Sequence, residues 1–172
     1  MLKIEESFKY IFERYYPKVL KQISWVVKDE FKAEDIAQEV FIKFLKKPPR
    51  HNENIGGWLS KVAMNHALNY LRTERSARVR EIEIFQQNEE KLLDDPEEIA
   101  IKNLEKSKVR EILLKMNKRD MMCLILKHSG YSYEEIAVAL GIKKSSVGTT
   151  IARAQKKFKE LYKKTNGKMS RG

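Results

Sequence analysis

The sequence predicts an all-α protein made of two small helical domains joined by an acidic linker. Apolar residues recur at three- and four-residue steps through most of the chain, and only seven glycines and four prolines interrupt its 172 residues. Charged residues fall into blocks. Residues 46–80 carry eight basic and two acidic side chains, residues 81–98 carry one basic and eight acidic side chains, and residues 141–172 carry ten basic and one acidic side chain. Two basic blocks around an acidic one predict two modules that face an anion.

We therefore place the first domain at residues 1–80, the linker at 81–98 and the second domain at 99–172. The net charge of +11 indicates nucleic acid, a membrane surface or an acidic protein as partner. No apolar run approaches the roughly 20 residues that a membrane-spanning helix needs, so no membrane insertion is expected. The N-terminus has no secretory pattern and Cys123 is the only cysteine, which together predict a cytoplasmic protein.

The first domain contains two recognisable helices. An apolar stripe predicts the first over residues 34–46, and Pro48-Pro49 ends it. The segment PRHNENIGG has the composition of a loop. The second helix is predicted to start near Trp58 and to end among its arginines. The stripe of the first helix consists of Ile36, Ala37, Val40, Phe41, Phe44 and Leu45.

The second domain carries the sharpest local signal, a helix-turn-helix. Ser132 and Glu135 form a capping box at the start of one helix. Gly141 suits a turn that needs a positive φ, and Ser145 or Ser146 can cap the next helix. An ordinary helical corner would show the same spacing. The strongly basic second helix favours a helix that enters the major groove of DNA.

Three motifs in order resemble the extracytoplasmic-function (ECF, group IV) sigma factors. AEDIAQEVFIKFLKK resembles region 2.2, GGWLSKVAMNHALNYLR resembles regions 2.3 and 2.4, and GYSYEEIAVALGIKKSSVGTTIARA resembles region 4. The resemblance covers roughly residues 5–164. It implies two helical domains: domain 2 binds the clamp helices of RNA polymerase and captures the melted −10 element, and domain 4 binds the polymerase flap and reads the −35 element.

The resemblance assigns a role to three groups of residues. Polymerase binding falls on three residues that lie off the apolar stripe, where a solvated polar face is the alternative: Asp35, Gln38 and Glu39. The residues assigned to binding of the −10 region are Asn65, Trp58, His51, Asn52, Arg72, Arg75 and Arg78. For Asn65 the alternative is a local helix hydrogen bond, and for Trp58 a role in the core is equally well supported. The −35 recognition helix falls on Lys144, Thr149, Arg153, Gln155, Lys156 and Lys157.

The recognition helix departs from the family pattern. Relatives often carry a basic residue and a serine after the GTV of this helix, whereas this chain reads GTTIARAQKK. The basic side chains come later, at Arg153, Lys156 and Lys157, so the base contacts of the family do not transfer directly to this chain.

The resemblance implies core RNA polymerase, promoter DNA and an anti-sigma factor as partners. A transcriptional regulator that binds duplex DNA without polymerase is the alternative, but it leaves the helix at residues 34–46 unexplained. No enzymatic activity, cofactor or metal is expected, because His51, His66 and His128 are isolated and no catalytic motif is present.

Overall fold

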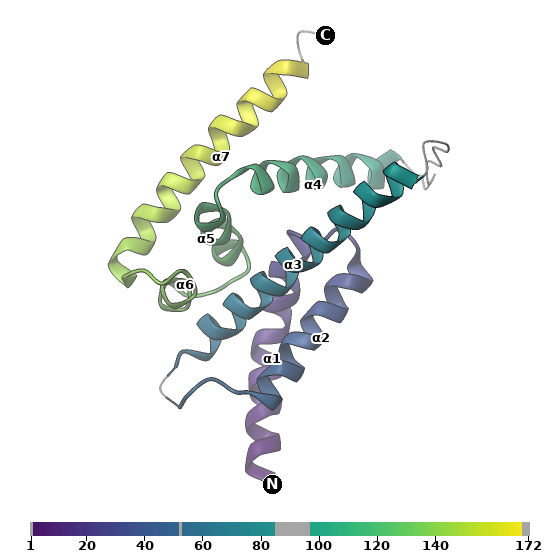
Figure 1. Ribbon diagram of the computed structural model, residues 1–172. Helices are drawn as coiled ribbons and strands as arrows, with labels where there is room; N and C mark the ends of the chain where they lie inside the picture. Colours follow the sequence, from purple (N-terminus) through teal and green to yellow (C-terminus); the bar gives the residue numbers. More distant parts are fainter. Residues whose placement is uncertain (1, 52, 85–96, 170–172) are drawn as a thin grey trace.

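The computed structural model describes residues 2–51, 53–84 and 97–169, and within these ranges it contains helices and no strand (Figure 1). The all-α prediction is confirmed. The elements are α1 (Leu2–Ser24), α2 (Glu30–Lys46), α3 (Ile55–Ile84), α4 (Glu97–Lys115), α5 (Lys118–His128), α6 (Tyr133–Leu140), a 3-10 turn η1 (Lys144–Ser146) and α7 (Val147–Met169).

Helices α1, α2 and α3 pack together and bury a shared apolar core. On α2 the predicted stripe faces this core, and Val40 and Phe41 are almost completely buried. Leu45 is the exception: it lies in the last turn of the helix and remains 55% exposed. The helix begins four residues earlier than predicted, because the side chain of Asp29 accepts a hydrogen bond from the backbone N–H of Lys32 and caps it.

The prediction for the start and end of α3 was wrong. The helix begins at Ile55, so Gly56 and Gly57 belong to its first turn and not to a loop. The side chain of Asn54 accepts a hydrogen bond from the backbone N–H of Gly57 at 2.7 Å and so caps this turn. At its other end α3 continues to Ile84, past the proposed domain boundary at residue 80. Most of the proposed linker, residues 85–96, lies outside the described residues.

The second half of the chain contains the predicted helix-turn-helix. The capping box of Ser132 and Glu135 is present at the start of α6, and Gly141 adopts φ 65° and ψ 38° at its end. The serines predicted to cap the next helix, Ser145 and Ser146, lie in the 3-10 turn η1, which directly precedes α7. The N-cap residue of this turn, Lys143, makes no side-chain capping bond.

The two halves pack against each other, which the two-domain prediction did not anticipate. Helix α6 lies against α3, and α5 lies near α1 (Figure 1). Gly56 and Gly57 make the close approach possible: a Cβ on Gly57 would lie 2.5 Å from Cγ1 of Val138, and one on Gly56 would overlap the Glu135 carboxylate. One continuous apolar core therefore runs through both halves.

None of the described helices combines the length and the apolar character required to cross a bilayer. Cys123 is completely buried in the core, as expected for a small apolar side chain in the MMCLIL run.

Candidate nucleic-acid interface

The three residues assigned to polymerase binding lie together on the exposed side of α2. Asp35, Gln38 and Glu39 are exposed, whereas Ile36 and Ala37 beside them are buried. Truncation of the three exposed side chains would therefore leave no cavity in the core. Asp35 and Glu39 border a hollow of about 310 Å³ between α2 and α3, where Nδ1 of His66 lies 3.5 Å from Oε2 of Glu39.

The residues assigned to the −10 element lie along α3 and the segment before it. Asn65 is exposed, and its Oδ1 accepts a hydrogen bond from Nζ of Lys118, the first residue of α5, at 3.3 Å. Trp58 is half-buried and its ring packs edge-on against Phe44, with 5.9 Å between ring centroids. His51 is exposed, and Asn52 lies outside the described residues.

The arginines of α3 form an exposed basic strip. Arg72, Arg75 and Arg78 follow one another at three-residue steps, which places them near the same side of the helix. Arg78 donates a hydrogen bond to Oε1 of Glu74 at 3.1 Å. Exposed cations spaced in this way suit the phosphates of a nucleic-acid backbone.

The exposed face of α7 carries most of the residues assigned to DNA recognition. At about 100° per residue, Thr149, Arg153, Lys156 and Lys157 fall within roughly one quarter to one third of the helix circumference. All four are exposed, while Val147, Ile151 and Ala154 on the opposite side are buried.

Three residues assigned to DNA recognition have positions or contacts that the assignment did not foresee. Lys144 lies in η1, ahead of the recognition helix and not on it. Gln155 points away from Thr149 and Arg153 and lines an apolar hollow instead. The Arg153 guanidinium lies 3.6 Å from Oδ1 of Asp120, a buried carboxylate oxygen without a hydrogen-bond partner. Arg153 therefore also compensates a buried negative charge.

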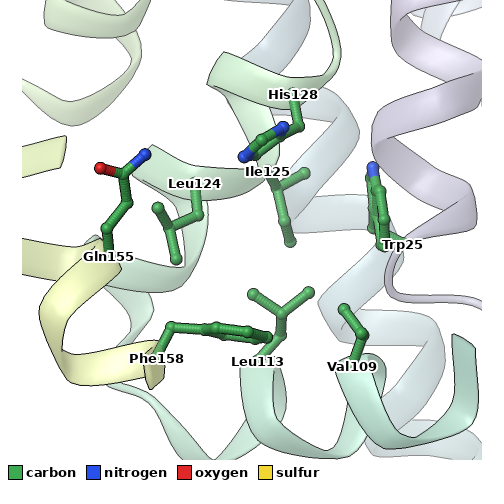
Figure 2. A pocket seen from close by; sticks show the side chains of 8 residues that line it. All are labelled: Trp25, Val109, Leu113, Leu124, Ile125, His128, Gln155 and Phe158. Carbon is green, nitrogen blue, oxygen red and sulfur yellow. The ribbon is translucent and has the colours of Figure 1, made fainter. Parts of the chain in front are cut away.

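The apolar hollow beside Gln155 was not predicted from the sequence. It has a volume of about 310 Å³ and is bounded by α4, α5, α7 and the segment after α1, as Figure 2 shows. Trp25 forms one wall, and its buried indole N–H has no hydrogen-bond partner. The sequence shows the apolar periodicity of the helices, but it does not show that these four segments meet around one hollow. The lining residues are Trp25, Val109, Leu113, Leu124, Ile125, His128, Gln155 and Phe158.

Buried hydrogen bonds join the two halves of the chain, and the sequence analysis did not predict them. The Tyr15 hydroxyl on α1 donates to Oε1 of Glu135 on α6 at 2.6 Å. The Tyr131 hydroxyl donates to Oε1 of Gln22 at 3.0 Å, and Nε2 of Gln22 donates to the carbonyl of Ser60 at 2.7 Å. Burial, followed by the bond to Glu135, raises the pKa of Tyr15 to about 12. Partners more than 100 residues apart give no local sequence signal.

No group of histidine, cysteine, aspartate or glutamate side chains within residues 2–51, 53–84 and 97–169 is arranged to hold a metal ion.

Both halves of the sequence match known protein families. Residues 11–77 match the family Sigma-70 region 2, and residues 106–158 match the family Sigma-70, region 4. The chain is 28% identical over 167 residues to the RNA polymerase sigma factor YlaC of Bacillus subtilis, an alignment that covers 95% of this chain and 96% of that protein. It is 29% identical over 164 residues to the ECF RNA polymerase sigma factor SigX of the same organism, covering 89% and 82%.

Solved structures share the fold. The sigma factor RpoE of Bartonella quintana, in complex with the anti-sigma factor NepR, superposes with a TM-score of 0.60 at 22% identity, covering 92% of this chain and 98% of that one. CnrH, in complex with the cytosolic domain of CnrY, superposes with a TM-score of 0.61 at 19% identity, covering 91% and 88%. Because the two family matches together span most of the chain in the order that the motifs predicted, this chain belongs to the sigma-70 family and is one of its ECF sigma factors, the alternative sigma factors of transcription initiation.

Proposed function

We propose that this sigma factor binds core RNA polymerase through the exposed side of α2. The observation that carries this proposal is the division of α2 into two faces: its apolar stripe is buried, while Asp35, Gln38 and Glu39 are exposed. A patch of polar side chains on a rigid helix can pair with a complementary surface without any cost for ordering the backbone. His66 lies beside Glu39 and would help to orient its carboxylate.

The −10 element would be held along α3. The Asn65 amide offers a donor and an acceptor to an extruded base, and Arg72, Arg75 and Arg78 would neutralise the phosphates of the same strand. His51 and Asn52 would contribute from the segment before α3. Trp58 is only partly buried, so it could stack on a base while it keeps its edge-on contact with Phe44.

The −35 element would be read by the exposed face of α7. Thr149, Arg153, Lys156 and Lys157 share this face, and Lys144 in η1 would add a phosphate contact next to it. Gln155 lies with Phe158 at the apolar hollow, so its role would be in protein contact rather than base reading. The family role of domain 4 suggests that the polymerase flap packs into this hollow.

These contacts require the two halves to separate. We call the packing of the two halves seen in the structure the closed arrangement. In it, Lys118 donates a hydrogen bond to the Asn65 amide oxygen, and Trp25 from the first half forms a wall of the hollow that the flap would enter. Both proposed surfaces are therefore restricted until the bond between Tyr15 and Glu135 breaks. We propose that polymerase binding supplies the free energy for this opening.

The other predicted properties follow from this role. We propose a first domain at residues 1–80, with α3 extending to Ile84, a second domain at 99–172, and a linker between them. The solved relative RpoE is bound to an anti-sigma factor, and we propose a comparable partner for this chain. We expect it to act in the cytoplasm, where polymerase works, without catalysis or a cofactor of its own. A regulator that acts without polymerase would leave the Sigma-70 region 2 half unexplained.

Holoenzyme assembly tests the proposal directly. The double variant Gln38→Ala with Glu39→Ala should lose binding to core RNA polymerase in a pull-down, while its helical circular-dichroism signal stays that of the wild type. Glu13→Ala, on the exposed side of α1, serves as the control and should bind normally. Normal assembly of the double variant would show that the α2 surface is not the polymerase contact.

A further inference from the structure

A basic cavity lies at the seam between α3 and the helices α5 and α6. It has a volume of about 340 Å³, which falls in the range of small-molecule sites. Lys61 and Asn65 enter it from α3, and Lys118 and Arg119 enter it from the first turn of α5. The cavity is therefore complete only when the two halves of the chain are together.

The cations of this cavity lack a negative partner. Among the described residues, no carboxylate oxygen lies within 4.0 Å of the charged groups of Lys61, Lys118 or Arg119, and no acidic residue lines the cavity. The one acidic side chain in the first turn of α5, Asp120, is buried and lies close to Arg153. Lys118 and Arg119 are neighbours on α5 in any arrangement, and packing of the two halves adds Lys61 of α3 to them without a compensating carboxylate, so the added repulsion opposes closure.

We propose that this cavity binds a small, multiply charged phosphate anion that bridges Lys61 of α3 and Lys118 and Arg119 of α5. Lysine ammonium and arginine guanidinium groups form charge-assisted hydrogen bonds with phosphate oxygens. The anion replaces the repulsion between the cations with attraction and so holds the two halves closed. Met122 and Ile142 form an apolar wall beside the cations, which suits the base of a nucleotide better than a bare phosphate chain.

The anion acts on promoter use through Asn65, and this step rests on the proposed function. Asn65 lines the same cavity and already accepts a hydrogen bond from Lys118. A ligand that stabilises the closed arrangement keeps Asn65 away from the −10 strand. The bound anion is therefore an inhibitor of promoter opening, and its effect weakens once polymerase has separated the halves.

Isothermal titration calorimetry on the full chain tests the site without polymerase, so its result does not depend on the proposed function. Inorganic pyrophosphate and ATP are titrated separately, without magnesium and at constant ionic strength. Saturable binding of one anion per chain is expected. Tighter binding of ATP shows that the apolar wall contributes, and equal binding shows that the phosphates alone determine affinity; both support the site.

Paired variants separate this cavity from the general positive charge. Lys61→Ala with Lys118→Ala should weaken binding at least about tenfold, because two bridging contacts are lost. Lys9→Ala with Lys28→Ala removes the same charge outside the cavity and should leave the affinity nearly unchanged. The absence of saturable binding, or an equal loss in both double variants, would overturn the proposal. Wild-type circular dichroism for each variant ensures that a loss of binding reflects the site and not unfolding.

Discussion

Tyr15→Phe should shift the protein from the closed toward the open arrangement. The substitution removes only the hydroxyl that donates to Oε1 of Glu135 at 2.6 Å, and the ring that packs in the core remains. Both partners are buried, with Tyr15 8% and Glu135 5% exposed, so water does not replace the lost bond while the halves are together. A hydrogen bond to a charged group contributes about 1.5–3 kcal/mol. The ratio of closed to open molecules should therefore fall roughly 10- to 140-fold.

The emission of Trp25 reports this shift, because its indole lies at the seam and becomes exposed to water on opening. The chain has two tryptophans, so the measurement is made in a Trp58→Phe background that leaves Trp25 as the sole source. Tyr15→Phe should move the emission maximum to longer wavelength and speed hydrogen exchange in α6. Tyr10→Phe is the matched control: Tyr10 is 61% exposed, and its hydroxyl accepts a bond from Arg14 of the same helix. If the two variants behave alike, the bond between Tyr15 and Glu135 does not hold the halves together.

Three further predictions follow from the described surfaces. Asn65→Ala should impair promoter opening, measured by permanganate reactivity of the −10 strand, more than holoenzyme assembly. Arg153→Ala should relax preference at one position of the −35 element, at a cost of about 1–3 kcal/mol if it reads a base, whereas Lys156→Ala should lower transcription from all promoters alike. Absorbance at 295 nm should show Tyr15 ionising near pH 12; since its folded-state pKa is raised, the stabilisation is complete below pH 10 and is lost as the pH rises toward 12.

Each of these predictions has a contrary result. Normal open complexes with Asn65→Ala would assign Asn65 a local structural role. Arg153→Lys keeps the charge beside Asp120, so a loss of folding stability in Arg153→Ala that lysine restores would separate the structural role of Arg153 from recognition. For the titration, Tyr15→Phe should remove the tyrosine that ionises near pH 12, while Tyr131, whose pKa burial also raises, still ionises late. An unchanged profile would assign the signal near pH 12 to another residue.

Local patterns predicted much of the second half of the chain. The capping box of Ser132 and Glu135 and the positive φ of Gly141 depend on residues close in sequence, and both appear as expected. The sequence did not predict the 3-10 turn before α7, which contains both serines proposed as caps. Gln155 stays a prediction as a groove contact; it lines the apolar hollow, on another side of α7 from Thr149 and Arg153, which its place in the basic run did not indicate.

Features that depend on tertiary contacts could not be predicted. Gly56 and Gly57 suggested a loop, but they lie in a helix, where their missing side chains admit Glu135 and Val138. Glu135 shows the limit most clearly: the sequence identified its capping role, while its second partner, Tyr15, lies 120 residues away. The same applies to the hollow beside Trp25, which four separate segments enclose.

Run-off transcription with core RNA polymerase on a library of genomic fragments tests the central claim most directly. The chain added to core enzyme should produce discrete transcripts from a limited set of promoters that share −10 and −35 elements. The Gln38→Ala, Glu39→Ala double variant should produce none of them. Transcription no different from that of core enzyme alone, with a protein that is folded and binds duplex DNA by itself, would contradict the account and favour a regulator that acts without polymerase.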